Sequence, residues 1–178
     1  MNLRKIAGLC IASVLCLAMP AVSHADTYTL TNSNGGDGYI VGSAPSFQLF
    51  GADNEVGSNY TTYTTTASAA ETVNFDWSYT TFDSDGSVWD PAGYLLNGVY
   101  TQLSTNGDIG GQFDTSGTTS VNLLAGDTFG FYVYSADSVA GRGELDVNMA
   151  PTPEPSSLLL LGSGLLGLAG VVRRRLLA

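Results

Sequence analysis

Hydrophobic and polar residues alternate along most of the segment from Asp26 to Met149, and no part of that segment repeats with a helical period. The stretch Thr72–Thr80 is the clearest case, because every second side chain is apolar and those between are polar. Alternation with a period of two is typical of β-strands that bury one face. The apolar positions of this stretch, which are predicted to point inward, are Val73, Phe75, Trp77 and Tyr79.

The same alternation predicts several further strands. In Asp127–Ser135 it places Phe129, Phe131 and Val133 on one face. The other predicted strands are Thr27–Thr31, Ser46–Phe50, Gly93–Leu96, Val99–Leu103, Ser120–Leu124 and Arg142–Met149.

Clusters of Gly, Asn, Asp and Ser separate these strands and predict turns. Asn97-Gly98 lies between two apolar runs and is the strongest signal for a two-residue hairpin. Many short strands, each with one buried face, require two packed antiparallel sheets. The sequence therefore predicts an all-β antiparallel β-sandwich of jelly-roll type.

The first 25 residues have a different character. Arg4 and Lys5 are followed by an apolar run up to Met19 and then by small residues. This order is typical of a secretory signal peptide, and it predicts cleavage between Ala25 and Asp26. A retained N-terminal anchor is the alternative.

The last 29 residues differ again. The proline-rich stretch 150–157 predicts an extended linker, since proline removes backbone donors and fixes φ. Leu158–Val172 carries no charge, and Arg173, Arg174 and Arg175 follow it. This predicts a short transmembrane helix within 158–178, with the arginines as a cytoplasmic stop. A plain single-pass anchor is the simplest interpretation.

The order of features in this tail resembles the PEP-CTERM protein-sorting segment of Gram-negative bacteria. The signature corresponds to Pro153, Glu154 and Pro155, and Thr152 stands where valine is common in that family. The resemblance implies recognition and removal by a membrane-embedded exosortase, in bacteria that often make exopolysaccharide. It covers only the tail and implies no activity for the remainder of the chain.

Charge and residue types narrow the function of the exported part. Fifteen of the sixteen acidic residues, but only Arg142 among the six basic ones, lie between Asp26 and Ala150. So acidic a surface repels phosphate, which argues against nucleic-acid binding. This segment also has no His, Cys or Lys, so the usual catalytic triads, thiol nucleophiles and zinc sites have no residues to form them. We therefore expect that the chain is not an enzyme, and we predict that it binds no metal or cofactor.

Two segments nevertheless carry candidate chemistry. Asp83, Asp85 and Asp90 bring oxygen ligands together around Gly86, but the calcium-loop pattern is not met and a simple turn explains them. Trp89 lies in a predicted loop beside Asp90 and is a candidate ligand contact. The aromatic residues considered as a sugar-stacking platform are Trp77, Tyr79, Trp89, Tyr94 and Tyr100, of which the first two are expected in the core.

The threonine-rich run Tyr60–Thr66 raises the possibility of ice binding. An ice-binding face requires threonines repeated on successive strands. Only this one run is evident, so an edge strand or an exposed loop is the expected structure.

Together these features predict four parts: a signal peptide (1–25), a β-sandwich (26–149), a linker with the Pro-Glu-Pro motif (150–157) and a sorting tail (158–178). The expected function is that of an exported surface or extracellular-matrix protein. Its expected partners are the Sec-type export machinery, signal peptidase and exosortase, with the inner membrane as an intermediate location. The alternative is a module that binds carbohydrate such as exopolysaccharide, with or without calcium.

Overall fold

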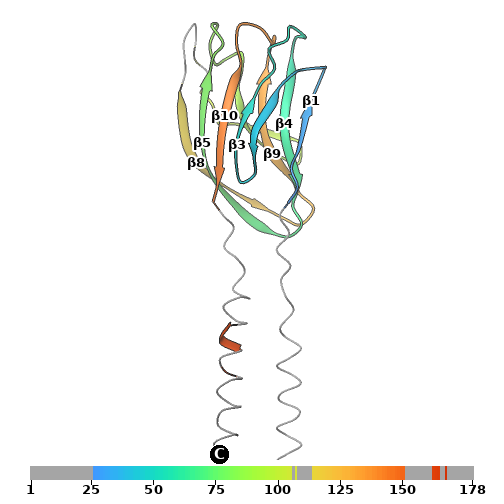
Figure 1. The fold of residues 1–178 in the computed structure, drawn as a ribbon, viewed down its shortest axis with the longest axis vertical. Helices are drawn as coiled ribbons and strands as arrows, with labels where there is room; N and C mark the ends of the chain where they lie inside the picture. The colour runs from blue at the N-terminus through green and yellow to red at the C-terminus, as the bar shows by residue number, and fades with distance from the viewer. Residues whose placement is uncertain (1–25, 106, 108–113, 151–161, 165–166, 168–178) are drawn as a thin grey trace, which may run out of the picture. The chain divides into compact units, whose positions relative to one another are not determined.

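The computed structural model describes residues 26–105, 107, 114–150, 162–164 and 167, and the fold lies in the compact unit Ala25–Thr152 (Figure 1). The predicted signal peptide falls outside the described residues, as do the linker from residue 151 and most of the predicted transmembrane segment. Among the described residues, no helix is long and apolar enough to cross a bilayer.

The described part of the unit consists of ten strands joined by turns and loops. In chain order they are β1 (Thr29–Asn32), β2 (Tyr39–Ser43), β3 (Ser46–Phe50), β4 (Asn59–Thr66), β5 (Glu71–Thr81), β6 (Ala92–Leu96), β7 (Val99–Gln102), β8 (Thr115–Leu123), β9 (Thr128–Ser135) and β10 (Gly143–Met149).

These strands form two five-stranded sheets, ordered β1-β4-β9-β6-β7 and β2-β3-β10-β5-β8. All neighbouring strands are antiparallel. The predicted two-sheet antiparallel sandwich is therefore confirmed. Without β1 and β2, the orders β4-β9-β6-β7 and β3-β10-β5-β8 are those of a jelly roll.

The core lies between the sheets and is mainly aromatic. Phe131 of β9 meets Phe75 of β5 edge to face, with ring centroids 4.9 Å apart, and Phe47 of β3 at 5.4 Å. Tyr79, Leu49 and Leu145 are fully buried beside them. The alternation of β5, β9 and β10 therefore predicts the inward faces correctly, and burial of such rings is the main stabilising contribution.

The hairpin prediction is also confirmed. Leu96 pairs with Val99, so Asn97 and Gly98 alone form the turn between β6 and β7. Their φ angles are +51° and +79°, which is the conformation that a two-residue hairpin of type I′ requires.

The threonine-rich run differs from its prediction. It forms β4, an interior strand with β1 on one side and β9 on the other. Thr61 and Thr65 are buried with Tyr63, and the Thr65 hydroxyl donates to the carbonyl of Thr27. The run shows no alternation of apolar and polar residues, because the branched, partly polar side chain of threonine fits either face of a sheet.

The two ends of the sandwich are unlike. Short turns join β2 to β3 and β6 to β7 at the end where β1 begins and β10 ends. The connections β1–β2, β3–β4, β5–β6 and β9–β10 are longer, and all lie at the opposite end (Figure 1). We call this opposite end, comprising residues 33–38, 51–58, 82–91 and 136–142, the loop end.

Candidate functional site

The outer face of the sheet β1-β4-β9-β6-β7 carries no charged side chain within its five strands. Register and alternation assign the outward positions. They are Thr29, Thr31, Tyr60, Thr62, Thr64, Thr66, Gly93, Leu95, Tyr100, Gln102, Thr128, Gly130, Tyr132 and Tyr134. We call these residues the tyrosine–threonine face. It is uncharged although acidic residues greatly outnumber basic ones in the domain.

Four tyrosines from three strands form a cluster on this face. The Tyr60 ring lies 4.6 Å from that of Tyr134 and 4.7 Å from that of Tyr100, centroid to centroid. Tyr100 meets Tyr132 edge to face at 4.9 Å. Tyr132 is buried by these neighbours, whereas Tyr100 remains 43 % exposed. The cluster therefore presents aromatic surface and hydroxyl groups to solvent.

Gly93 lets the strand that carries Tyr100 approach closely. A Cβ atom at Gly93 would collide with the carbonyl oxygen of Thr101 and lie 3.0 Å from the Gln102 Cα. Gly93 lies on the outward face of β6 and places no side chain there, and Tyr100 contacts Tyr60 although β9 and β6 separate their strands.

Burial favours the neutral form of two tyrosines of the cluster, Tyr132 and Tyr60. Burial raises the pKa of Tyr132 to about 12, and the neighbouring Tyr60 and Tyr100 add to the effect. Burial likewise raises the pKa of Tyr60, with contributions from Tyr100 and Tyr134. Neutral phenols both donate and accept hydrogen bonds, so these hydroxyls suit a ligand rich in hydroxyl groups.

The other half of the face is an array of threonines. Thr29 pairs with Thr64 and Thr31 with Thr62, so two adjacent strands present hydroxyls side by side. Sheet geometry spaces them by roughly 5 Å across the strands and about 7 Å along them. Thr66 continues the array along β4 and pairs with Thr128 of β9, but only this one threonine of β9 belongs to the array.

The outer face of the second sheet is different in character. Asp76, Asp146 and Glu144 point outward there, and the carboxylates of the first two accept hydrogen bonds from Thr118 and Ser78. A shallow groove of about 560 Å³ crosses this face beside Gln48. Its lining includes the carboxylates of Asp76 and Asp146, whereas the tyrosine–threonine face has no carboxylate.

Trp89 lies in the connection β5–β6 at the loop end, opposite Ala136, which follows Tyr134 of the cluster by two residues. Its side chain is 42 % exposed. Two apolar neighbours in the same connection are also exposed, Val88 at 41 % and Phe82 at 53 %. Its backbone is fixed, since the Ala136 N–H donates to its carbonyl. The side chain is thus free to contact a ligand, and that role for Trp89 stays a prediction.

The aromatic platform considered from the sequence does not assemble as one surface. Tyr79 is fully buried and its hydroxyl donates to the Asp90 carbonyl. Trp77 and Tyr94 are half-buried and pack against the core. Tyr100 joins a cluster that the sequence analysis missed, formed with Tyr60, Tyr132 and Tyr134.

A simple signal pointed to two of these missed residues. Once Phe129, Phe131 and Val133 are assigned to the core, Tyr132 and Tyr134 must face outward. Aromatic side chains at two outward positions of a central strand are thus a sequence signal for an aromatic cluster on the outer face of the sheet.

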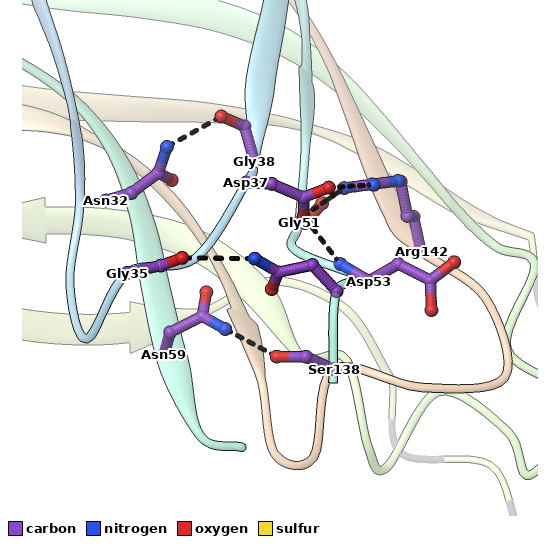
Figure 2. A network of polar contacts seen from close by, with 10 residues as sticks. Asn32, Gly35, Asp37, Gly38, Gly51, Asp53, Asn59, Ser138 and Arg142 are labelled. Atoms are coloured by element: carbon purple, nitrogen blue, oxygen red, sulfur yellow. Dashed lines mark hydrogen bonds and ion pairs between the residues drawn. The ribbon is translucent and has the colours of Figure 1, made fainter. Parts of the chain in front are cut away.

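Polar contacts hold the connections of the loop end together (Figure 2). Arg142 pairs with Asp37 and donates to the Gly51 carbonyl at 2.6 Å, while Asp37 also accepts the N–H of Asp53. Asn59 donates to the Ser138 hydroxyl. These bonds join three connections, so the loop end is a structured surface.

The predicted processing sites lie at or beyond the limits of the described residues. Asp26 is the first described residue, and Ala25 lies outside. The predicted sorting motif, Pro153, Glu154 and Pro155, and the arginines Arg173, Arg174 and Arg175 also lie outside the described residues.

Several solved structures resemble the sandwich. A family 35 carbohydrate binding module from Clostridium thermocellum is 13 % identical, with a TM-score of 0.35, and the match covers 68 % of this chain and 97 % of that one. A CBM35 from Cellvibrio japonicus Abf62 is 15 % identical, with a TM-score of 0.36 and coverages of 68 % and 92 %.

A third similar structure is a carbohydrate binding module from Cellvibrio mixtus lichenase 5A in complex with cellotriose. It is 12 % identical, with a TM-score of 0.32, and the match covers 68 % of this chain and 95 % of that one. TM-scores below 0.5 do not establish a common fold, and the fold described above rests on strand pairing instead. No curated protein sequence matches the chain.

The family model of the PEP-CTERM protein-sorting motif matches residues 151–175. The matched segment contains the Pro-Glu-Pro signature, the uncharged run and the arginine cluster in the expected order. Residues 151–175 of this chain are therefore a PEP-CTERM protein-sorting motif.

Proposed function

We propose that this chain is an exported surface or matrix protein whose tyrosine–threonine face binds neutral stretches of exopolysaccharide. The observation that carries the proposal is the absence of charge from all five strands of that face, in a domain that is otherwise strongly acidic. Loss of charge over a whole sheet face favours contact with an uncharged partner.

The delivery part of the proposal rests on the two ends of the chain. The sorting motif at 151–175 supports export and processing at the membrane. A signal peptide would direct the chain to the Sec-type machinery, and signal peptidase would then cut it between Ala25 and Asp26. Exosortase would then remove the tail after recognising Pro153, Glu154 and Pro155, with Arg173, Arg174 and Arg175 held in the cytoplasm until that step.

The binding part rests on the chemistry of the face. Sugar rings have apolar faces and hydroxyl edges, so they suit an exposed phenol ring beside hydroxyl groups. Tyr100 offers the ring, and Thr29, Thr31, Thr62 and Thr64 offer hydroxyls on neighbouring strands. The proposal involves no catalytic step.

Affinity electrophoresis of the full-length chain in a nonionic detergent, in gels containing the host exopolysaccharide or a neutral glucan, tests the binding. Tyr100→Ala removes the exposed ring, and we expect affinity to fall about tenfold because one ring contact contributes roughly 1–1.5 kcal/mol. Tyr39→Ala is the matched control. Tyr39 is equally exposed, at 43 %, but faces outward on the other sheet, so its loss should leave binding unchanged.

Trp89→Ala separates this surface from the second candidate. Trp89 is comparably exposed but lies outside the strands of the tyrosine–threonine face, so the proposal requires that its removal weakens binding less than the removal of Tyr100 does. Loss of binding with Trp89→Ala but not with Tyr100→Ala would transfer the site to the loop end. If the wild-type chain migrates equally in gels with and without each neutral polysaccharide, the carbohydrate proposal is wrong.

A further inference from the structure

Two carboxylates are buried under the connection β5–β6 at the loop end. The side chain of Asp83 is 2 % exposed and that of Asp90 is not exposed at all. A carboxylate leaves water at a large cost in free energy unless a cation or several hydrogen bonds replace the water.

Their hydrogen bonds satisfy only half of their oxygen atoms. Asp83 Oδ1 accepts the N–H of Asp85 at 2.6 Å, and Asp90 Oδ2 accepts the Thr81 hydroxyl at 3.4 Å. The remaining oxygens, Asp83 Oδ2 and Asp90 Oδ1, are buried and have no partner. The Thr81 hydroxyl also accepts the Asp83 N–H, so it lies next to both aspartates.

The charges around the pair are all negative. Asp137, Asp85 and Asp53 act on Asp83, and Asp83 and Asp137 act on Asp90. Burial, together with these neighbours, raises the pKa of Asp90 to about 7, against the opposing effect of hydrogen bonds from Ser135 and Thr81. Burial also raises the pKa of Asp83, against the opposing hydrogen bond from the Asp85 N–H. Arg142, the one basic residue in the described part of the chain, is occupied by Asp37 and the Gly51 carbonyl.

We propose that Asp83 and Asp90 bind a divalent cation, calcium in particular, through their unpartnered oxygens. Calcium accepts carboxylate, hydroxyl, carbonyl and water oxygens in irregular arrangements of six to eight ligands. No three acidic side chains among the described residues converge on one point. The two carboxylates would therefore share the ion with the Thr81 hydroxyl, backbone carbonyls and water.

A bound cation would fix the connection that carries Trp89. Asp83 and Asp90 lie near the two ends of this connection, and β5 precedes it with Thr81 as its last residue. The ion would thus order a surface at the loop end. This inference does not depend on polysaccharide binding by the tyrosine–threonine face.

Thermal unfolding of the full-length chain in nonionic detergent tests the proposal. After EDTA treatment, added calcium should raise Tm by an amount that grows with the logarithm of its concentration. In the double variant Asp83→Asn/Asp90→Asn this rise should disappear. The double variant Asp76→Asn/Asp146→Asn removes the same charge from the outer face of the sheet that contains β5 and β10, and it should keep the rise.

Terbium luminescence supplies a second measurement. The Tyr79 hydroxyl lies 2.7 Å from the Asp90 carbonyl oxygen, so excitation of tyrosine should sensitise a terbium ion held there, and calcium should displace it. If the double variant does not fold, the single variant Asp90→Asn replaces it in this measurement. The terbium emission of that variant should be lower than that of the wild-type chain. A Tm that is unchanged at millimolar calcium and magnesium would overturn the proposal, as would full emission in the Asp83/Asp90 variants.

Discussion

Arg142 forms an ion pair with Asp37 across the loop end, with its Nη2 atom 2.6 Å from Asp37 Oδ2. Arg142 precedes β10, and Asp37 lies in the connection β1–β2. The same guanidinium donates to the Gly51 carbonyl and lies 5.5 Å above the Tyr39 ring. The single basic residue in the described part of the chain thus joins three separate segments.

Arg142→Ala should therefore destabilise the fold more than a surface ion pair alone would suggest. An exposed pair contributes at most about 1 kcal/mol, but loss of the charged hydrogen bond to Gly51 adds roughly another 1 kcal/mol. We expect a loss of about 2 kcal/mol by urea denaturation, and a smaller loss, under about 1 kcal/mol, for Asp37→Asn. Equal losses in the two variants would contradict the role of the Gly51 contact.

The same pair predicts a pH dependence. The hydrogen bond from Arg142 lowers the pKa of the Asp37 carboxyl, against a smaller opposing effect of burial. A lowered folded-state pKa stabilises the protein above the unfolded value of about 4, and this contribution is lost as the pH falls through the lower folded value. Denaturation between pH 6 and pH 2 should show that Asp37→Asn has its largest effect at pH 6. An effect that persists unchanged at pH 2 would be inconsistent with the pair.

Ser138 separates backbone strain from hydrogen bonding at the loop end. It is fully buried with φ at +58°, accepts the Asn59 amide at 2.5 Å and donates to the Gly57 carbonyl at 2.6 Å. Ser138→Ala loses both bonds and keeps the strain, so it should cost about 2–3 kcal/mol. Ser138→Gly loses the bonds but relieves the strain, and should cost roughly 1 kcal/mol less. The opposite order would show that the strain is absent.

The hairpin turn offers a purely conformational test. Gly98 has φ at +79° and open space where a Cβ atom would lie, and Gly57 at the loop end has the same φ and the same open space. Substitution by alanine should therefore cost about 1 kcal/mol at either position, from backbone strain alone. Chemical denaturation of both variants measures this, and a clear inequality would mean that neighbouring contacts contribute.

Processing of the chain is tested by the intact mass of the protein isolated from its host. A mature form that begins at Asp26 and ends near Pro155 is expected if signal peptidase and exosortase both act. Replacing Pro153, Glu154 and Pro155 by alanine should leave Arg173, Arg174 and Arg175 on the product. A wild-type protein that retains these arginines would reduce the tail to a membrane anchor.

The sequence predicts the sandwich well because its core strands have one strictly apolar face. In Asp127–Ser135 and Thr72–Thr80 the choice between inward and outward positions is unambiguous. In Tyr60–Thr66 the inward and outward positions cannot be told apart from the sequence, since threonine is compatible with both faces. The strand Tyr39–Ser43 is not predicted from the sequence, because its outward positions, Tyr39 and Val41, are apolar and exposed.

The candidate surfaces depend on information that no local pattern contains. Tyr60 meets Tyr100 through the order of the strands and the absence of a side chain at Gly93. Asp83 and Asp90 read as turn residues in the sequence, and only the packing of the loop end shows that they are buried. Both features arise from tertiary contacts between distant segments.

The position of the last strand determines how the domain carries mechanical load. β10 lies between β3 and β5, and the Tyr28 hydroxyl contacts the sulfur of Met149 at its end. A pull on the residues after Met149, directed along the strand, would load two hydrogen-bonded ladders in shear, so many bonds would have to break together. A protein retained at a cell surface by its C-terminal side would thereby resist extraction of its terminal strand.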